Sequence, residues 1–103
     1  MTDTIVVTGT DTDVGKTVFA AALAGALGAD YFKPVQAGLE PPTDTDTVRA
    51  LSGLPDAHFV PEAYRLRSPL SPHRAAEIDG YALDPAKLVL PARERTLVVE
   101  LAG

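Results

Sequence analysis

Short apolar runs alternate with stretches of helical periodicity along the chain. Residues 5–7, 31–35 and 96–101 are rich in β-branched or aromatic side chains and predict short buried strands. Pro34 cannot donate a ladder hydrogen bond, so pairing along the second of these strands should end near Lys33. Residues 59–66 predict a further extended piece, with a proline at position 61.

The first helix is expected over residues 18–27, starting where the preceding loop ends. Phe19, Leu23 and Leu27 are spaced four apart and predict one apolar stripe, and Gly28 follows as a C-cap. Small Ala and Gly residues at most other positions allow close packing against a sheet.

A second helix should begin at Thr43 or Asp44 and stop at the Gly-Leu-Pro of residues 53–55. Val48 and Leu51 are three apart and are predicted to form its inner face. Shorter helices are expected over residues 74–78 and 83–90.

Strands that alternate with helices predict an α/β fold, in which a parallel sheet with right-handed crossovers is flanked by helices. The 103 residues contain neither a repeat nor a break in composition, so one domain over residues 1–103 is expected. Ligands of such sheets lie at the carboxyl ends of the strands. That rule brings residues 9–17, Lys33 and Glu100 to one edge of the predicted sheet.

The loop after the first strand, GTDTDVGKT at residues 9–17, has the features of a phosphate-binding loop. Phosphate groups require inward backbone N–H groups, a glycine where a side chain would block their approach, and a lysine for its charge. Gly15, Lys16 and Thr17 supply the end of the pattern G-x-x-x-x-G-K-[ST], although its first glycine stands one residue early, at Gly9. The loop therefore predicts a P-loop NTPase-type sheet.

Ten consecutive residues are predicted to bind the nucleotide. Lys16 should contact the terminal phosphates as a catalytic cation, and the Thr17 hydroxyl should ligate Mg²⁺. The set is Gly9, Thr10, Asp11, Thr12, Asp13, Val14, Gly15, Lys16, Thr17 and Val18.

The composition excludes several classes of protein. A net charge of −5 argues against a general binder of nucleic acid or of membrane surfaces. The absence of cysteine removes disulfide and thiolate chemistry. The apolar run at residues 18–27 is too short for a bilayer, which needs about 20 residues, and acidic rather than basic residues precede it. A cytoplasmic protein is expected.

The sequence GTDTDVGKT closely resembles the P-loop of dethiobiotin synthetases. KPVQAG at residues 33–38, SPHRAAEIDG at 71–80 and VVELAG at 98–103 resemble further stretches of that family, in the same order. The resemblance implies an ATP- and Mg²⁺-dependent homodimeric ligase of biotin synthesis. In the implied reaction CO₂ adds to 7,8-diaminopelargonate, the carbamate attacks the γ-phosphate of ATP, and ring closure gives dethiobiotin, ADP and phosphate.

The resemblance also implies roles for single residues. Lys33 would be catalytic, steadying the carbamate and the transferred phosphoryl group. Thr17, Glu100 and either Asp44 or Asp46 would hold Mg²⁺, although both aspartates also suit the N-terminus of a helix without any metal. Two positions depart from the family pattern. Ala37 replaces a hydroxyl residue, and Leu101 replaces a glycine, so its side chain is expected to crowd a backbone that should approach the substrate closely.

The chain is shorter than dethiobiotin synthetases and corresponds to an N-terminal half. An exposed strand edge is therefore expected at residues 96–101, open to pairing with another chain. Two alternatives stay open. One is a P-loop ATPase switch of the partitioning or metal-delivery type, although residues 10–13 lack the extra lysine that such proteins often carry. The other is an inactive nucleotide-binding fragment.

Overall fold

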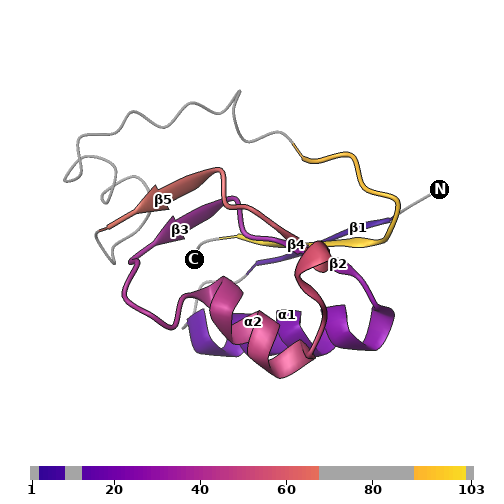
Figure 1. The fold of residues 1–103 in the computed structure, drawn as a ribbon, viewed down its shortest axis with the longest axis horizontal. Helices are drawn as coiled ribbons and strands as arrows, with labels where there is room; N and C mark the ends of the chain where they lie inside the picture. Colours follow the sequence, from indigo (N-terminus) through magenta and orange to yellow (C-terminus); the bar gives the residue numbers. More distant parts are fainter. Residues whose placement is uncertain (1–2, 9–12, 68–89, 102–103) are drawn as a thin grey trace.

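The computed structural model describes residues 3–8, 13–67 and 90–101. Within them, four parallel strands form the main sheet in the order β1 (Thr4–Val7), β6 (Leu97–Glu100), β2 (Asp30–Phe32) and β4 (Phe59–Val60). A second sheet pairs β3 (Val35–Ala37) with β5 (Tyr64–Leu66). Helices α1 (Asp13–Leu27) and α2 (Asp44–Ser52) lie on the same side of the main sheet, and a short 3₁₀ helix, η1 (Asp56–His58), precedes β4 (Figure 1). The predicted parallel α/β architecture is confirmed.

Helix α1 begins at Asp13, within the predicted phosphate loop, and not after Thr17 as expected. The predicted apolar stripe holds only at Leu23, which packs against the core, because Phe19 is 58% exposed and Leu27 52% exposed. The buried apolar residues in the described part of α1 are Ala20, Ala21 and Ala24. Small side chains let the helix lie close to the sheet, and this contact buries alanine in preference to the larger residues.

Helix α2 begins and ends where the sequence predicts. Thr43 accepts a hydrogen bond from the Asp46 N–H, and the Asp46 carboxylate accepts one from the Thr43 N–H, which completes a capping box. Gly53 ends the helix in the left-handed region, with φ of 68°. Val48 is fully buried as expected, but Leu51 is 59% exposed, because the buried stripe of this helix does not reach its last turn.

Two extended segments, residues 30–37 and 59–66, are each divided between the main sheet and the second sheet. The first ends in the main sheet at Phe32, as the proline at position 34 predicts, and Val35 opens β3 in the second sheet. The second divides in the same way between β4 and β5. The Pro34 carbonyl accepts hydrogen bonds from the Ala63 and Tyr64 N–H groups, both at 2.9 Å, so the two crossings lie side by side.

The predicted free edge at residues 96–101 is wrong, because β6 lies between β1 and β2 and all four of its residues are buried. The edges of the main sheet are β1 and β4. A long connection lets a strand insert between earlier strands, and chain order alone does not show this. The helices predicted at residues 74–78 and 83–90 fall in a segment that lies, apart from Leu90, outside the described residues.

Apolar side chains pack on both faces of the main sheet. Toward the helices, Tyr31 and Val98 join the alanines of α1 and Val48 of α2. On the other face, Phe32, Leu97 and Val99 form a separate cluster. None of the helices in the described part of the chain combines the length and apolar character that a membrane span requires.

One buried carboxylate fastens the amino-terminal end of β2. Asp30, 1% exposed, accepts hydrogen bonds from Arg93 at 2.7 Å and Arg95 at 3.0 Å, and His58 Nδ1 lies 3.3 Å from it. These contacts attach residues 93–95 and η1 to the sheet, at the end opposite to the predicted phosphate loop.

Candidate functional site

The strand register places the predicted site residues side by side. Phe32 of β2 pairs with Val99 of β6, so the residues that follow them, Lys33 and Glu100, come together at the carboxyl end of the sheet. Side chains alternate between the faces of a strand, so Lys33 shares a face with Tyr31, and Glu100 shares one with Val98. That face is covered by α1, whose first turns carry Lys16 and Thr17.

Glu100 lies at the centre of the site and is 0% exposed. Its Oε2 accepts a hydrogen bond of 2.8 Å from the Thr17 hydroxyl, and its Oε1 accepts one of 2.7 Å from the Tyr31 hydroxyl. The Lys33 ammonium is 3.6 Å from Oε2. A buried carboxylate needs such partners, because desolvation otherwise makes its charged form costly.

Lys33 is an enclosed cation between two carboxylates. It is 3% exposed, and its Nζ is 2.7 Å from Asp44 Oδ2 as well as close to Glu100. The carboxylates balance its charge, so its burial is explained in the absence of a bound anion. Its ammonium does face the site, as the family resemblance implies, and is not directed to solvent.

The two candidate aspartates of α2 have different surroundings. Asp44 reaches Lys33, and its backbone N–H donates to Gln36 Oε1 at 3.3 Å. Asp46 closes the capping box with Thr43 and lies 3.8 Å from Arg49 on the outer side of the helix. The structure therefore brings Asp44 to the site, whereas Asp46 stabilises the start of the helix.

Lys16 reaches the same end of the sheet from α1. Its ammonium donates a hydrogen bond of 3.0 Å to the Leu101 carbonyl, directly after Glu100. Leu101 is 39% exposed, and its N–H donates to the Val7 carbonyl at 3.0 Å. The departure from glycine at this position therefore leaves the backbone bonded to β1, with the leucine side chain partly in solvent.

No described atom crowds the backbone of the predicted phosphate loop at Gly15. Gly15 lies in the first turn of α1. A Cβ added at Gly15 would meet no described atom within 4 Å, so packing within the described chain does not require a glycine there. A phosphate that approaches the backbone closely would require it. Val18 is 47% exposed, and residues 9–12 lie outside the described residues.

Oxygen atoms of the kind that Mg²⁺ binds meet near Lys33. Thr17 and Glu100 are in direct contact, and the Lys33 ammonium is close to both Glu100 and Asp44. The described residues contain no group of three or more His, Cys, Asp or Glu side chains that could hold a metal by themselves. Mg²⁺ fits this donor set, because it keeps several waters and needs only one or two carboxylates.

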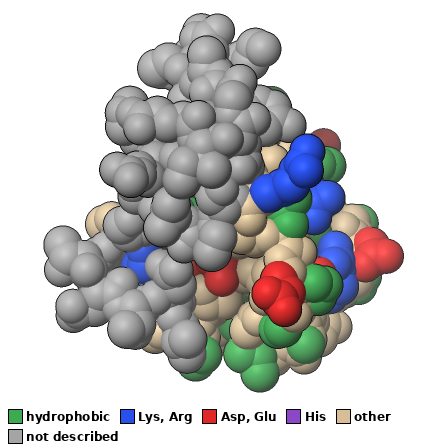
Figure 2. Space-filling view, turned by 90° about the vertical axis from the view of Figure 1, so that its left-hand side faces the viewer, with side chains coloured by type: hydrophobic (Ala, Val, Ile, Leu, Met, Phe, Trp, Pro, Cys, Tyr) green, Lys and Arg blue, Asp and Glu red, His purple; other side chains and the backbone are tan. Residues whose placement is uncertain are grey.

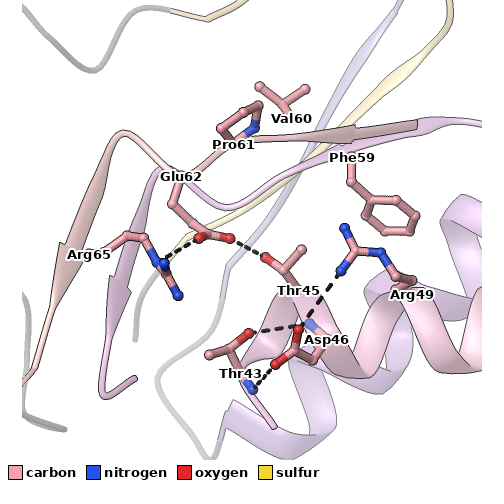
Figure 3. Close-up of a pocket in the computed structure, with 9 residues that line it drawn as sticks. All are labelled: Thr43, Thr45, Asp46, Arg49, Phe59, Val60, Pro61, Glu62 and Arg65. Atoms are coloured by element: carbon pink, nitrogen blue, oxygen red, sulfur yellow. Dashed lines mark hydrogen bonds and ion pairs between the residues drawn. The ribbon is translucent and has the colours of Figure 1, made fainter. Parts of the chain in front are cut away.

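A neighbouring hollow of about 260 Å³ lies between the start of α2 and the segment from β4 to β5 (Figure 3). Glu62 accepts a hydrogen bond of 2.6 Å from the Thr45 hydroxyl and is 3.2 Å from Arg65. Arg49 stacks over Phe59 at 4.7 Å and pairs with the capping aspartate. On the face shown in Figure 2, described basic and acidic side chains are likewise interspersed. The charges around this hollow are satisfied by one another.

Sequence reasoning missed Tyr31 and Gln36. Tyr31 stands two residues before Lys33 on the same face of β2, and this alternation was the available signal. Burial, followed by the nearby charge of Glu100, raises the pKa of Tyr31 far above its ordinary value, so the hydroxyl stays protonated and acts as a donor. Gln36 donates to the carbonyls of Ala37 and Gly38, both at 3.1 Å, and so shapes the loop after Lys33.

Other positions singled out in the sequence contribute less. Ala37 is half-buried in β3 and offers only its backbone. The SPHRAAEIDG stretch at residues 71–80 lies outside the described residues.

Comparison with known proteins identifies the family. The AAA domain family matches residues 3–103. Proteins named "ATP-dependent dethiobiotin synthetase BioD" from two strains of Rhodopseudomonas palustris are 65% and 66% identical over 103 residues, and one of the same name from Rhizorhabdus wittichii is 64% identical. These matches cover 100% of the chain but only 48% or 49% of the relatives. The chain thus spans about half the length of the curated relatives it matches, and the resemblance read from its motifs is confirmed.

Proposed function

Since this chain belongs to the AAA domain family, we propose that it is the phosphate-handling part of an ATP-dependent dethiobiotin synthetase. The observation that carries the proposal is the meeting of Lys16, Thr17, Lys33 and Glu100, from three separate elements, at the carboxyl end of one parallel sheet. The names of the relatives supply the reaction class. The substrates are then ATP, CO₂ and 7,8-diaminopelargonate.

The chemistry has three steps, and each amine that forms a bond to carbon also releases a proton to solvent. One amine of the diamine adds CO₂, and an oxygen of the resulting carbamate attacks the γ-phosphorus of ATP, with ADP as leaving group. The second amine then attacks the carbonyl carbon and expels phosphate, which closes the cyclic urea of dethiobiotin. The protein must neutralise phosphate charge and align the attacking oxygen with phosphorus.

The residues of this chain fit these tasks. Lys16, at the start of α1, contacts the terminal phosphates. Lys33 exchanges part of its contact with Asp44 and Glu100 for the oxygens of the transferred group. The buried setting makes each such charge interaction stronger than it would be in water.

Thr17, Asp44 and Glu100 would hold Mg²⁺, directly or through water. The ion supplies positive charge that screens the phosphate oxygens. We keep Asp44 in this role and assign Asp46 to the helix cap. A homodimer and a cytoplasmic location remain predictions.

The experiment is a product assay on a chain of the relatives' length. Dethiobiotin and ADP are measured with ATP, Mg²⁺ and bicarbonate, with and without 7,8-diaminopelargonate. We expect both products only when the diamine is present. ADP release that does not depend on the diamine would favour the ATPase switch, and binding of ATP without any product would favour an inactive nucleotide-binding protein.

Lys33→Ala tests the proposed site in the same assay. Turnover should fall about 10²–10³-fold, because one electrostatic contact to the transferred group is lost, while ATP affinity changes far less. Arg65→Ala is the matched control, because it removes one positive charge from a side chain that is 59% exposed and lies outside the site. Near-normal turnover of Lys33→Ala would contradict the assignment.

A further inference from the structure

The two oxygens of Glu100 have separate partners. Oε2 accepts from Thr17 and faces Lys33, whereas Oε1 accepts only the Tyr31 hydroxyl among the contacts of the described residues. Tyr31 is 0% exposed and packs on Val98 and the alanines of α1. Its hydroxyl is therefore directed at the site from the protein interior.

We propose that Tyr31 is a positioning residue, which holds Glu100 so that Oε2 alone faces Thr17 and the metal. The inference rests on the proposed function and deepens its description of the metal site. A carboxylate attached through an sp³–sp² torsion turns over a broad range of angles unless a partner fixes it. The hydrogen bond of 2.7 Å from Tyr31 supplies that partner.

The effect passes from Glu100 to Thr17. The Thr17 hydroxyl has one proton and two lone pairs, and its proton is directed to Glu100 Oε2 at 2.8 Å. With the proton in this direction, the lone pairs are free to face a cation. A rotated Glu100 would release that proton and let the hydroxyl point elsewhere, so Tyr31 sets the orientation of a metal ligand that it does not touch.

Packing of the ring does not account for the hydroxyl. The ring lies tilted against Phe59, with centroids 6.2 Å apart and an interplanar angle of 58°. A phenylalanine would make these apolar contacts and would place no polar atom in the core. The hydroxyl is explained by the carboxylate that it binds.

Tyr31→Phe in a chain of the relatives' length tests the proposal. ATP binding is measured by calorimetry across a range of Mg²⁺ concentrations and in EDTA. We expect the Mg²⁺ concentration that gives half-maximal enhancement of ATP binding to rise about 10–100-fold, as when other partners that orient metal ligands are removed. The ATP affinity measured in EDTA should change little. Tyr64→Phe is the control, because it removes a phenol hydroxyl from β5, in the other sheet.

Combination with Glu100→Gln separates positioning from a general structural effect. If Tyr31 acts through Glu100, adding Tyr31→Phe to Glu100→Gln should weaken the Mg²⁺ dependence of ATP binding little beyond the effect of Glu100→Gln alone. An unchanged Mg²⁺ dependence in Tyr31→Phe, equal losses in both backgrounds, or wild-type ATP binding that ignores Mg²⁺ would each overturn the proposal. Wild-type protein that binds ATP with Mg²⁺ but forms no dethiobiotin would refute the proposed function and leave the role of Tyr31 standing.

Discussion

Glu100 has no exposed surface, yet side chains from α1, β2 and the segment after β2 reach its carboxylate. Its charge is balanced by Lys33, whose own charge is shared with Asp44. Such a network is sensitive to the loss of any member, because removing one partner leaves another charge buried without compensation. At the scale of the residue, the site is therefore a set of mutually dependent charges.

Lys16→Ala provides a prediction at this scale. Its ammonium now binds the Leu101 carbonyl, next to the site, and is expected to bind phosphate oxygens when ATP is present. Loss of one charge-assisted contact should weaken ATP affinity about 10–100-fold. Calorimetry in a chain of the relatives' length measures the effect, with Arg65→Ala again as control. Unchanged affinity in a folded variant would refute the phosphate-loop assignment.

At the scale of the element, the start of α2 serves two purposes. Its capping box satisfies the first N–H groups of the helix, and the same turn brings Asp44 to Lys33. Gln36 links this turn to the end of β3, because its side chain accepts from the Asp44 N–H and donates to the Ala37 and Gly38 carbonyls. The start of α2 and the end of β3 are thus built as one unit.

Thr43→Ala tests this unit. The variant should lower the free energy of unfolding by about 1 kcal/mol, because the helix loses a side-chain cap. Thr47→Ala makes the same chemical change inside α2, where alanine is favoured, and should cost little or nothing. Chemical denaturation compares the two. Equal stability of both variants would show that the cap contributes nothing measurable.

At the scale of the whole molecule, sheet order decides which strand is most enclosed. β6 comes last in the described chain but lies at the centre of the main sheet, while β1 comes first and lies at its edge. Val98 is 0% exposed and Val6 is 52% exposed. The carboxylate of Glu100 is fixed partly because the strand that carries it is held on both sides.

Val98→Ala and Val6→Ala test the order of the strands. Val98→Ala should lower the free energy of unfolding by about 2–3 kcal/mol, because it leaves a cavity between the sheet and α1. Val6→Ala should cost less than about 1 kcal/mol, since the side chain already contacts solvent. Denaturant titration gives both values, and a larger loss for Val6→Ala would contradict the central place of β6.

Local chemistry by itself determined the parallel α/β class, the start of α2 near Thr43, its stop at Gly53 and the end of β2 before Pro34. These features depend on neighbours within a few residues, through periodicity, glycine and proline geometry and capping, and the sequence displays such neighbours directly. The family motifs likewise led to Lys33 and Glu100.

Only the tertiary structure decided the position of β6, the alanine face of α1, the choice of Asp44 over Asp46 for the site, and the contact between Tyr31 and Glu100. Each depends on which elements become neighbours after a long connection closes. Phe19 and Leu51 show the reason clearly. Their apolar character predicts burial, but a side chain is buried only where another part of the protein packs on it. Within the described chain, the core packs on the alanines of α1 and on Val48 of α2, and not on Phe19 or Leu51.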